Sequence, residues 1–290
     1  MTGRLRGLGR ASVAALALIA AALFACVPAA GAGGSSKLAH SSIIGGATAN
    51  PAEWPFVVAI RDRGQPHCGG SVISPTKILT AGHCVLGIPA ADLTVITGRP
   101  NLADQSVGQV IPVASTVAYP GFGGNSSNFD FGVVTLAQPT TAPPVALATA
   151  AESAAATAQG ATLRVAGYGN QNPVKRRLSV VLKSVTQFSA GDRACFKEYG
   201  KRGLGAFDPV SEICVKGQKF RRFRDPEIRR KVQGRTSACN GDSGGPLMAD
   251  TPAGPRQVGT VSFGPFFCGY RAKPSVYGRV AAGLAFINGS

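Results

Sequence analysis

The chain consists largely of short runs of Val, Ile and Thr separated by turn-forming Gly, Pro and Asn. β-branched residues fit the pleated, half-buried surface of a strand, whereas Gly, Pro and Asn favour turns. With 290 residues and 44% hydrophobic content the chain can bury a substantial core. The pattern predicts an all-β fold. The predicted strands include 56–60, 93–97, 110–113, 163–166 and 258–262.

Residues 1–32 have the organisation of a secretory signal peptide. Three arginines among the first ten residues precede an apolar run over 11–27, and the small residues Ala30-Gly31-Ala32 follow it. A second interpretation stays open, because the four residues ending at Cys26 loosely resemble a bacterial lipoprotein cleavage site, although Phe24 is bulky for that motif. We expect the protein to be secreted, with lipidation of Cys26 as the less favoured alternative. No later segment of the sequence is long and apolar enough to suggest a transmembrane helix.

The cysteine count agrees with export. Of seven cysteines, removal of Cys26 with the signal peptide leaves an even number, as expected of disulfides formed in an oxidising compartment. Six cysteines allow 15 pairings, so the residues alone leave the pairing open. A metal site is disfavoured, because close Cys-x-x-Cys pairs are missing and the histidines do not cluster.

Residues 241–246 read Gly-Asp-Ser-Gly-Gly-Pro and place Ser243 in a glycine-rich turn. The backbone amides of such a turn can converge on a negatively charged oxygen, which is the geometry of an oxyanion hole. A serine is a poor nucleophile unless a histidine takes its proton and a buried carboxylate orients that histidine. His83 and Asp130 can supply both functions, since each lies at the edge of an apolar, strand-like run.

Each of these residues also has an ordinary structural role open to it. Ser243 and Asp130 can be turn residues, and His83 can be a satisfied core histidine. The apolar neighbours of Asp130 on both sides favour a buried carboxylate that needs a partner. His67 is the only competitor of His83 if the segment that contains His40 is removed.

Together with these three motifs, three others in the same order make the chain resemble the trypsin/chymotrypsin-type serine endopeptidases. They are Ile43-Ile44-Gly45-Gly46, Trp54-Pro55 and Ser262-Phe263-Gly264. The resemblance runs from Ile43 almost to the C-terminus. It implies two six-stranded antiparallel Greek-key β-barrels, with the active site in the cleft between them and a short C-terminal helix over 281–288. The crossover between the barrels would lie at about 138–159, a stretch with little periodicity that we expect to be irregular.

The resemblance also implies the roles of the site residues. Ser243 would be the nucleophile, His83 the general base and then acid, and Asp130 the residue that orients His83. The amides of Gly241 and Ser243 would form the oxyanion hole. No cofactor or metal is implied, because residues 85–119 contain only two carboxylates, too few for the calcium loop of some family members. The implied disulfides are Cys68–Cys84, Cys195–Cys214 and Cys239–Cys268.

The resemblance suggests that the protein is made as an inactive precursor. A carboxylate beside the nucleophile is costly to bury without a cation. In the family, the free amino group at the position of Ile43 pairs with the carboxylate at the position of Asp242. Residues 33–42 would then be a short propeptide and residues 43–290 the peptidase domain. Ser42 departs from the basic residue often found before the cut, so the activating protease is left open.

Specificity is predicted from the positions that match the family's primary pocket. Ser237 lies at its base, where trypsin-like members carry an aspartate, so a positively charged side chain would find no partner. Gly264 leaves the entrance open, and Ser275 narrows the pocket somewhat. Ser262 and Phe263 complete the substrate-binding strand. We expect cleavage after bulky apolar residues, with a small-residue preference as second choice and Arg or Lys as the least favoured.

The largest departure from the family is a basic insertion over 216–235. It carries nine Lys and Arg residues against Asp225 and Glu227, a net charge of +7. Removal of the four basic residues before Ile43 would reduce the charge of the chain from +16 to +12. Like charges repel, so we expect an exposed, extended loop. It can be a solvated insertion, a surface for anionic polymers, nucleic acid or lipid, or a gate for the pocket.

Two functions of different classes follow from these observations. The first is a secreted, monomeric serine endopeptidase that acts on protein or peptide substrates. The second is a catalytically inactive, basic binding protein on the same scaffold. The complete set of His83, Asp130 and Ser243 favours the enzyme.

Overall fold

A computed structural model describes residues 43–123, 128–172, 178–200, 206–224, 231–270 and 273–290, with the backbone alone at 220–224 and 231–233. The predicted signal peptide, Cys26 and the segment 33–42 therefore lie outside the described residues. Within the described ranges, no helix has the length and apolar character needed to cross a membrane.

The first barrel is closed by six antiparallel strands in the order β2-β3-β4-β7-β6-β5. Its core is lined by buried side chains such as Val58, Ile60, Val95 and Val134. Closure leaves no unpaired sheet edge, which suits a structure made of short strands. The strands are β2 (Val57–Asp62), β3 (Gln65–Ser74), β4 (Lys77–Thr80), β5 (Leu93–Thr97), β6 (Gln109–Ala118) and β7 (Gly132–Leu136).

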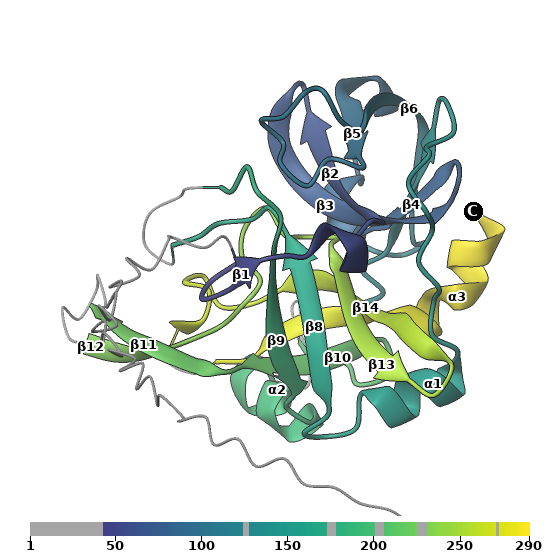
Figure 1. The fold of residues 1–290 in the computed structure, drawn as a ribbon. Coiled ribbons are helices and arrows are strands. Elements are labelled where there is room, and N and C mark those ends of the chain that lie inside the picture. Colours follow the sequence, from purple (N-terminus) through teal and green to yellow (C-terminus); the bar gives the residue numbers. More distant parts are fainter. Residues whose placement is uncertain (1–42, 124–127, 173–177, 201–205, 225–230, 271–272) are drawn as a thin grey trace, which may run out of the picture. The chain divides into compact units, whose positions relative to one another are not determined.

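The second barrel has the order β9-β10-β15-β14-β13-β8, closed by pairing of β8 with β9. Numbered within each barrel, both follow the order 1-2-3-6-5-4, so the expected pair of Greek-key barrels is confirmed. Figure 1 shows the first barrel above the second, with the C-terminal helix beside them. The strands are β8 (Thr162–Gly167), β9 (Lys183–Ser189), β10 (Glu212–Gly217), β13 (Pro246–Thr251), β14 (Gly254–Phe263) and β15 (Ser275–Arg279), and β1 (Ala47–Thr48) adds to the edge at β9.

Three α-helices accompany the barrels among the described residues, where we expected only the C-terminal one. The C-terminal helix α3 (Val280–Gly289) is confirmed, and α2 (Asp192–Tyr199) precedes β10. Helix α1 (Ala150–Ala156) interrupts the connection between the barrels, which we expected to be irregular. It begins with a capping box, in which the Thr149 side chain accepts from the amide of Glu152 and the Glu152 carboxylate accepts from the amide of Thr149. Short 3-10 helices lie at Pro51–Glu53, Gly82–Cys84 and Ala90–Asp92.

The basic insertion is not the extended loop that we expected. Its described parts form an antiparallel pair of strands, β11 (Lys219–Arg224) and β12 (Lys231–Arg235), drawn to the left of the second barrel in Figure 1. The prediction was wrong because charge repulsion acts on side chains, whereas backbone hydrogen bonds between two adjacent strands decide the local conformation. At its base, Lys216 has a lowered pKa because of partial burial and the nearby charges of Arg235 and Lys197.

Candidate active site

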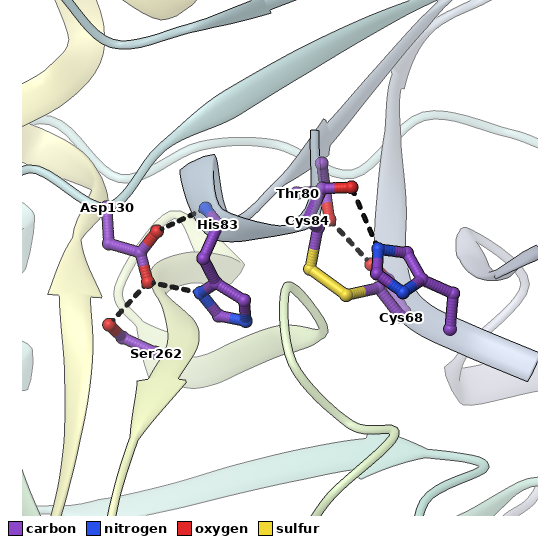
Figure 2. The surroundings of a disulfide bond; sticks show 8 residues. Cys68, Thr80, His83, Cys84, Asp130 and Ser262 are labelled. Carbon is purple, nitrogen blue, oxygen red and sulfur yellow. Dashed lines mark hydrogen bonds and ion pairs between the residues drawn. A yellow bond between two sulfur atoms is a disulfide. The ribbon is translucent and has the colours of Figure 1, made fainter. Parts of the chain in front are cut away.

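Asp130 is the centre of a hydrogen-bonded group at the boundary between the barrels (Figure 2). Its Oδ2 lies 2.8 Å from Nδ1 of His83 and accepts a hydrogen bond of 2.6 Å from the hydroxyl of Ser262. Its Oδ1 accepts from the backbone amide of His83 at 2.9 Å. The carboxylate is 4% exposed, whereas the His83 side chain is 37% exposed. The arrangement therefore buries the charge and leaves the imidazole accessible from solvent.

The Asp130 carboxylate is held by a strained piece of backbone. Phe129 has a φ of +54°, a value that is unusual for a bulky residue, and its carbonyl accepts from the amide of Phe131 at 2.7 Å. Two contacts offset the strain. The ring of Phe129 stacks on Tyr119 with centroids 4.7 Å apart, and Phe131 is fully buried against α3. Strain of this kind is often found beside active-site residues.

The turn that carries His83 is fastened by the disulfide between Cys68 and Cys84. The structure contains all three pairs that the family resemblance implied, namely Cys68–Cys84, Cys195–Cys214 and Cys239–Cys268. His67 lies near the first pair, where its Nε2 is 2.9 Å from the carbonyl oxygen of Cys84. Its sulfur neighbours are joined in the disulfide, so this group offers no thiolate to a metal. His67 is thus occupied by a backbone contact, away from Asp130.

The turn that carries Ser243 packs tightly on the first barrel. The amide of Gly69 in β3 donates to the carbonyl of Ser243 at 2.7 Å. Gly244 has a φ of +81°, and a Cβ there would collide with the hydroxyl of Thr80, three residues before His83. That hydroxyl is itself held by the carbonyl of Gly69 at 2.8 Å. The glycine thus lets the serine turn and the histidine turn meet.

Two backbone amides of this turn have no acceptor among the described residues. They belong to Gly241 and Ser243, whereas those of Asp242 and Gly244 donate to backbone carbonyls. Gly241 has a φ of +93°, which favours glycine, and a Cβ there would lie 2.7 Å from Leu178. The local conformation therefore leaves two donors beside the Ser243 hydroxyl that can receive a negative oxygen.

Asp242 is completely buried beneath this turn. Its Oδ1 accepts from the amide of Gly169 at 2.7 Å and its Oδ2 from the amide of Cys239 at 2.8 Å. Burial raises the pKa of its carboxyl to about 7, although both hydrogen bonds act in the opposite direction. A cation placed nearby would lower this pKa and favour the charged form.

Ile43 and Ile44 are also buried, next to the base of the pocket. Ile44 and Ser237 form an antiparallel bridge in which each amide donates to the other residue's carbonyl, at 2.9 and 3.1 Å. Ile43 is 0% exposed and packs in the core of the second barrel. The beginning of the described chain is thus part of the structure on which the pocket rests.

A pocket of about 300 Å³ opens beside Ser243. The hydroxyl of Ser237 donates to the carbonyl of Ala238 at 2.7 Å and lies 3.3 Å from that of Ser275. No carboxylate is present among the described residues that line it. Besides Ser243, the lining comprises Ser237, Ala238, Cys239, Asn240, Val261, Ser262, Phe263, Gly264, Pro265, Phe266, Cys268 and Ser275.

Ser262 has a contact that sequence reasoning missed. We assigned it to substrate binding, and it does line the pocket, but its hydroxyl is committed to Asp130. Ser262 and Asp130 are 132 positions apart, so the sequence gives no signal for this hydrogen bond, which depends on the packing of the two barrels. The strain at Phe129 likewise has no signature in the sequence.

Comparison with known proteins agrees with the fold. The family model described as Trypsin matches residues 43–287. A protein named Trypsin from Saccharopolyspora erythraea is 31% identical over 241 residues, which cover 83% of this chain and 94% of the relative. Trypsin 5G1 from Aedes aegypti is 32% identical over 279 residues, covering 91% and 94% respectively. The chain therefore belongs to the trypsin family and is a chymotrypsin-like serine endopeptidase.

Proposed function

We propose that Ser243 attacks the scissile carbonyl and forms an acyl-enzyme, and that His83 takes the serine proton and then delivers it to the leaving amine. Asp130 holds the Nδ1–H tautomer of His83 and stabilises the imidazolium that forms. The observation that carries this proposal is the pair of bonds from one Asp130 carboxylate to the ring and to the backbone of His83. Because both ends of the residue are held, the ring has one orientation.

The free amides of Gly241 and Ser243 are the proposed oxyanion hole. The carbonyl oxygen of the substrate becomes negatively charged during attack, and two fixed donors stabilise that charge without reorganisation. Positive φ at Gly241 and Gly244 keeps the turn in this form. Catalysis in this proposal uses protein groups alone.

The pocket beside Ser243 is the proposed site for the residue that precedes the cleaved bond. Hydroxyls at its base and the absence of a carboxylate in its described lining support a preference for bulky apolar side chains. A lysine or arginine would lose its hydration there without gaining an ion pair.

Export and activation form a second part of the proposal. Residues 1–32 serve as a signal peptide, residues 33–42 as a propeptide and residues 43–290 as the peptidase domain. The three disulfides suit an oxidising compartment outside the cytosol. Cleavage before Ile43 frees an amine that pairs with Asp242, and this cation would favour the charged form of a carboxyl whose pKa burial raises.

The hairpin formed by β11 and β12 is proposed to attach the enzyme to anionic polymers or surfaces. Its backbone register places Arg224 opposite Lys231 and Arg222 opposite Gln233, so cationic positions share one face of the ladder. Charge concentrated on a projecting pair of strands favours contact with an extended anion.

The test of the catalytic proposal uses the chain beginning at Ile43. A fluorophosphonate should label Ser243 in the wild type. The Ser243→Ala variant should fold normally, take up no label and hydrolyse peptides several orders of magnitude more slowly. Circular dichroism and the melting temperature serve as folding controls. Near-normal hydrolysis by the alanine variant would contradict the mechanism. A folded wild type that neither labels nor hydrolyses peptides would favour the inactive binding protein instead.

A further inference from the structure

The pocket beside Ser243 has an aromatic ring at its rim. Phe266 is one of the residues that line the pocket, yet it is 85% exposed, more than any other large apolar residue that the structure describes. A single exposed apolar side chain is common on a protein surface and by itself indicates nothing. The meaning of Phe266 therefore depends on what holds its ring and on what passes beside it.

Neighbouring aromatic side chains hold this ring. Phe266 packs edge to face against Phe267, with ring centroids 5.0 Å apart and an angle of 83° between the ring planes. Phe267 in turn lies 5.9 Å from the ring of Tyr270, which is buried. Edge-to-face aromatic pairs are favourable beyond the area that they bury. The row of three rings therefore anchors the exposed ring to the interior of the protein.

The backbone of the loop that carries these rings is also fixed. The disulfide between Cys239 and Cys268 ties it to the segment before the serine turn. The amide of Arg235 donates to the carbonyl of Gly269 at 3.0 Å. Gly269 has a φ of +70°, and a Cβ there would lie 2.1 Å from the carbonyl oxygen of Arg235, so the two segments approach closely. A surface that is held in this way needs little ordering when a ligand binds.

The strand that leads to Phe266 has an open edge. Strand β14 pairs with β13 as far as Thr260, and Val261 then exchanges backbone hydrogen bonds with Gly244 and Gly245. Beyond this point the edge has no further strand beside it among the described residues. Gly264 follows the end of β14, and its amide and carbonyl have no partner there either. An extended peptide can add to such an edge through backbone hydrogen bonds.

The register of that peptide follows from the pocket. Ser262 lies at the end of the open edge nearest to the proposed triad, because its hydroxyl bonds to Asp130. The pocket that receives the residue before the cleaved bond is lined by Gly264, so the preceding residues extend from Ser262 toward Gly264 and Phe266. Side chains alternate along an extended chain, and two residues span about 6.6 Å. The side chain two positions before the one in the pocket therefore shares its face and reaches the rim at Phe266, whereas the side chain between them faces away.

We propose that Phe266 is a specificity-determining residue that contacts the third residue before the cleaved bond and favours an aromatic or large apolar side chain there. Such a side chain covers the exposed ring and adds a further aromatic contact to the row of Phe266, Phe267 and Tyr270. The preferred substrates then carry two apolar side chains on one face of an extended segment. This inference rests on the proposed function, because it places the residue before the cleaved bond in the pocket beside Ser243.

The first test uses peptide substrates with Phe before the cleaved bond and either Phe or Ala at the third position before it. The wild type should prefer Phe over Ala at that position by roughly 10-fold in kcat/KM. In Phe266→Ala this preference should disappear, and Phe266→Trp should keep it. Peptides that vary at the second position before the bond are the matched control, because their selectivity should be the same in all three proteins. A wild-type preference in Phe266→Ala would overturn the proposal.

A second variant tests the same contact with charge. Phe266→Glu should favour Lys over Phe at the third position, since a carboxylate then takes the place of the ring, and it serves if Phe266→Ala fails to fold. An unchanged preference for Phe would count against the contact.

A binding measurement separates this inference from the catalytic proposal. The Ser243→Ala chain should bind the Phe peptide more tightly than the Ala peptide in a calorimetric titration, and adding Phe266→Ala should remove the difference. Hydrolysis by the wild type without a preference that depends on Phe266 would overturn the inference alone. A binding preference that depends on Phe266 in a protein that hydrolyses neither peptide would overturn the catalytic proposal and leave the contact in place.

Discussion

At the scale of single residues, the site depends on the Asp130 carboxylate, whose two oxygens are both hydrogen-bonded. Asp130 accepts three hydrogen bonds from two residues that lie far apart in the sequence. Each bond stabilises the ionised carboxylate and restricts its rotation. The orientation of His83 is therefore set by the Asp130 carboxylate, which Ser262 of the second barrel holds in turn, and the proposed general base needs no rearrangement before substrate arrives.

Gly264 provides a test of the pocket. A Cβ on this residue would lie 3.0 Å from the hydroxyl of Ser275, so a valine would obstruct the pocket entrance. We expect Gly264→Val to lower kcat/KM for substrates with Phe or Leu before the cleaved bond by roughly 100-fold, and for Ala substrates much less. Peptide substrates that differ at this one position measure the effect. The rate of labelling of Ser243 by a small fluorophosphonate serves as control, and an equal loss for all substrates would contradict the assignment.

The proposed pairing of the Ile43 amine with Asp242 gives a second prediction at this scale. A chain beginning at Ile43 should be active, whereas one with uncleavable residues before Ile43 should be roughly 100-fold less active or worse, because a buried carboxyl without its cation destabilises the serine turn. Turnover of one peptide substrate by both chains measures this. Asp242→Asn should reduce the mature chain toward the activity of the extended one. Equal activity of the two unsubstituted chains would refute activation by cleavage.

At the scale of elements, the basic hairpin β11–β12 allows binding to polyanions to be tested separately from peptide hydrolysis. Replacing the nine cations of 216–235 with Ser or Gln should abolish salt-sensitive retention on heparin and leave the hydrolysis of small peptides unchanged. The reason is that a cluster of positive charges attracts a polyanion through long-range forces that salt screens. Elution in a salt gradient and kcat/KM are the measurements.

The two outcomes of the hairpin experiment have different meanings. Equal retention of both proteins would show that the hairpin is a solvated insertion. A change in peptide preference would show instead that it gates the pocket, which is reached directly from β12 through Thr236 and Ser237.

At the scale of the whole molecule, two buried carboxyls make stability depend on pH. Burial raises the pKa of Glu212 to about 8 and that of Asp242 to about 7 in the uncut chain, above the usual 3.9 to 4.3 of unfolded carboxyls. Between these values the folded protein retains protons that the unfolded chain releases. The contribution of these two protonated carboxyls to the free energy of unfolding is therefore fully present below about pH 4 and is lost as the pH rises toward 8.

Urea unfolding of the uncut chain at pH 5, 6, 7 and 8 tests this dependence. Glutamine at position 212 has no proton to lose, so the free energy of unfolding of Glu212→Gln should rise relative to that of the wild type as the pH increases. The difference should grow by up to about 1.4 kcal/mol per pH unit. A constant difference across the range would contradict the assigned protonation of Glu212.

The sequence by itself determined the fold class, the six cysteines that pair and the motifs around His83, Asp130 and Ser243. These are local properties, since β-branched runs, turn residues and short motifs are read within a few positions. The Thr149-x-x-Glu152 pattern was also local and could have predicted α1, because it matches a capping box. We did not predict strands β11 and β12, because the expectation was based on the excess of positive charge. It did not consider that two segments adjacent in the sequence can pair through their backbones.

Only the tertiary structure decided how distant residues meet. The hydroxyl of Ser262 reaches Asp130 and Gly244 fits against Thr80 because the two barrels pack in a particular way. The barrels share one strand order without a visible repeat in the sequence. Such contacts depend on strand pairing and on the glycines that allow close approach, and each involves residues from both barrels. Local sequence contains no information about that packing, so the motifs could be read from the sequence and the contacts that support them could not.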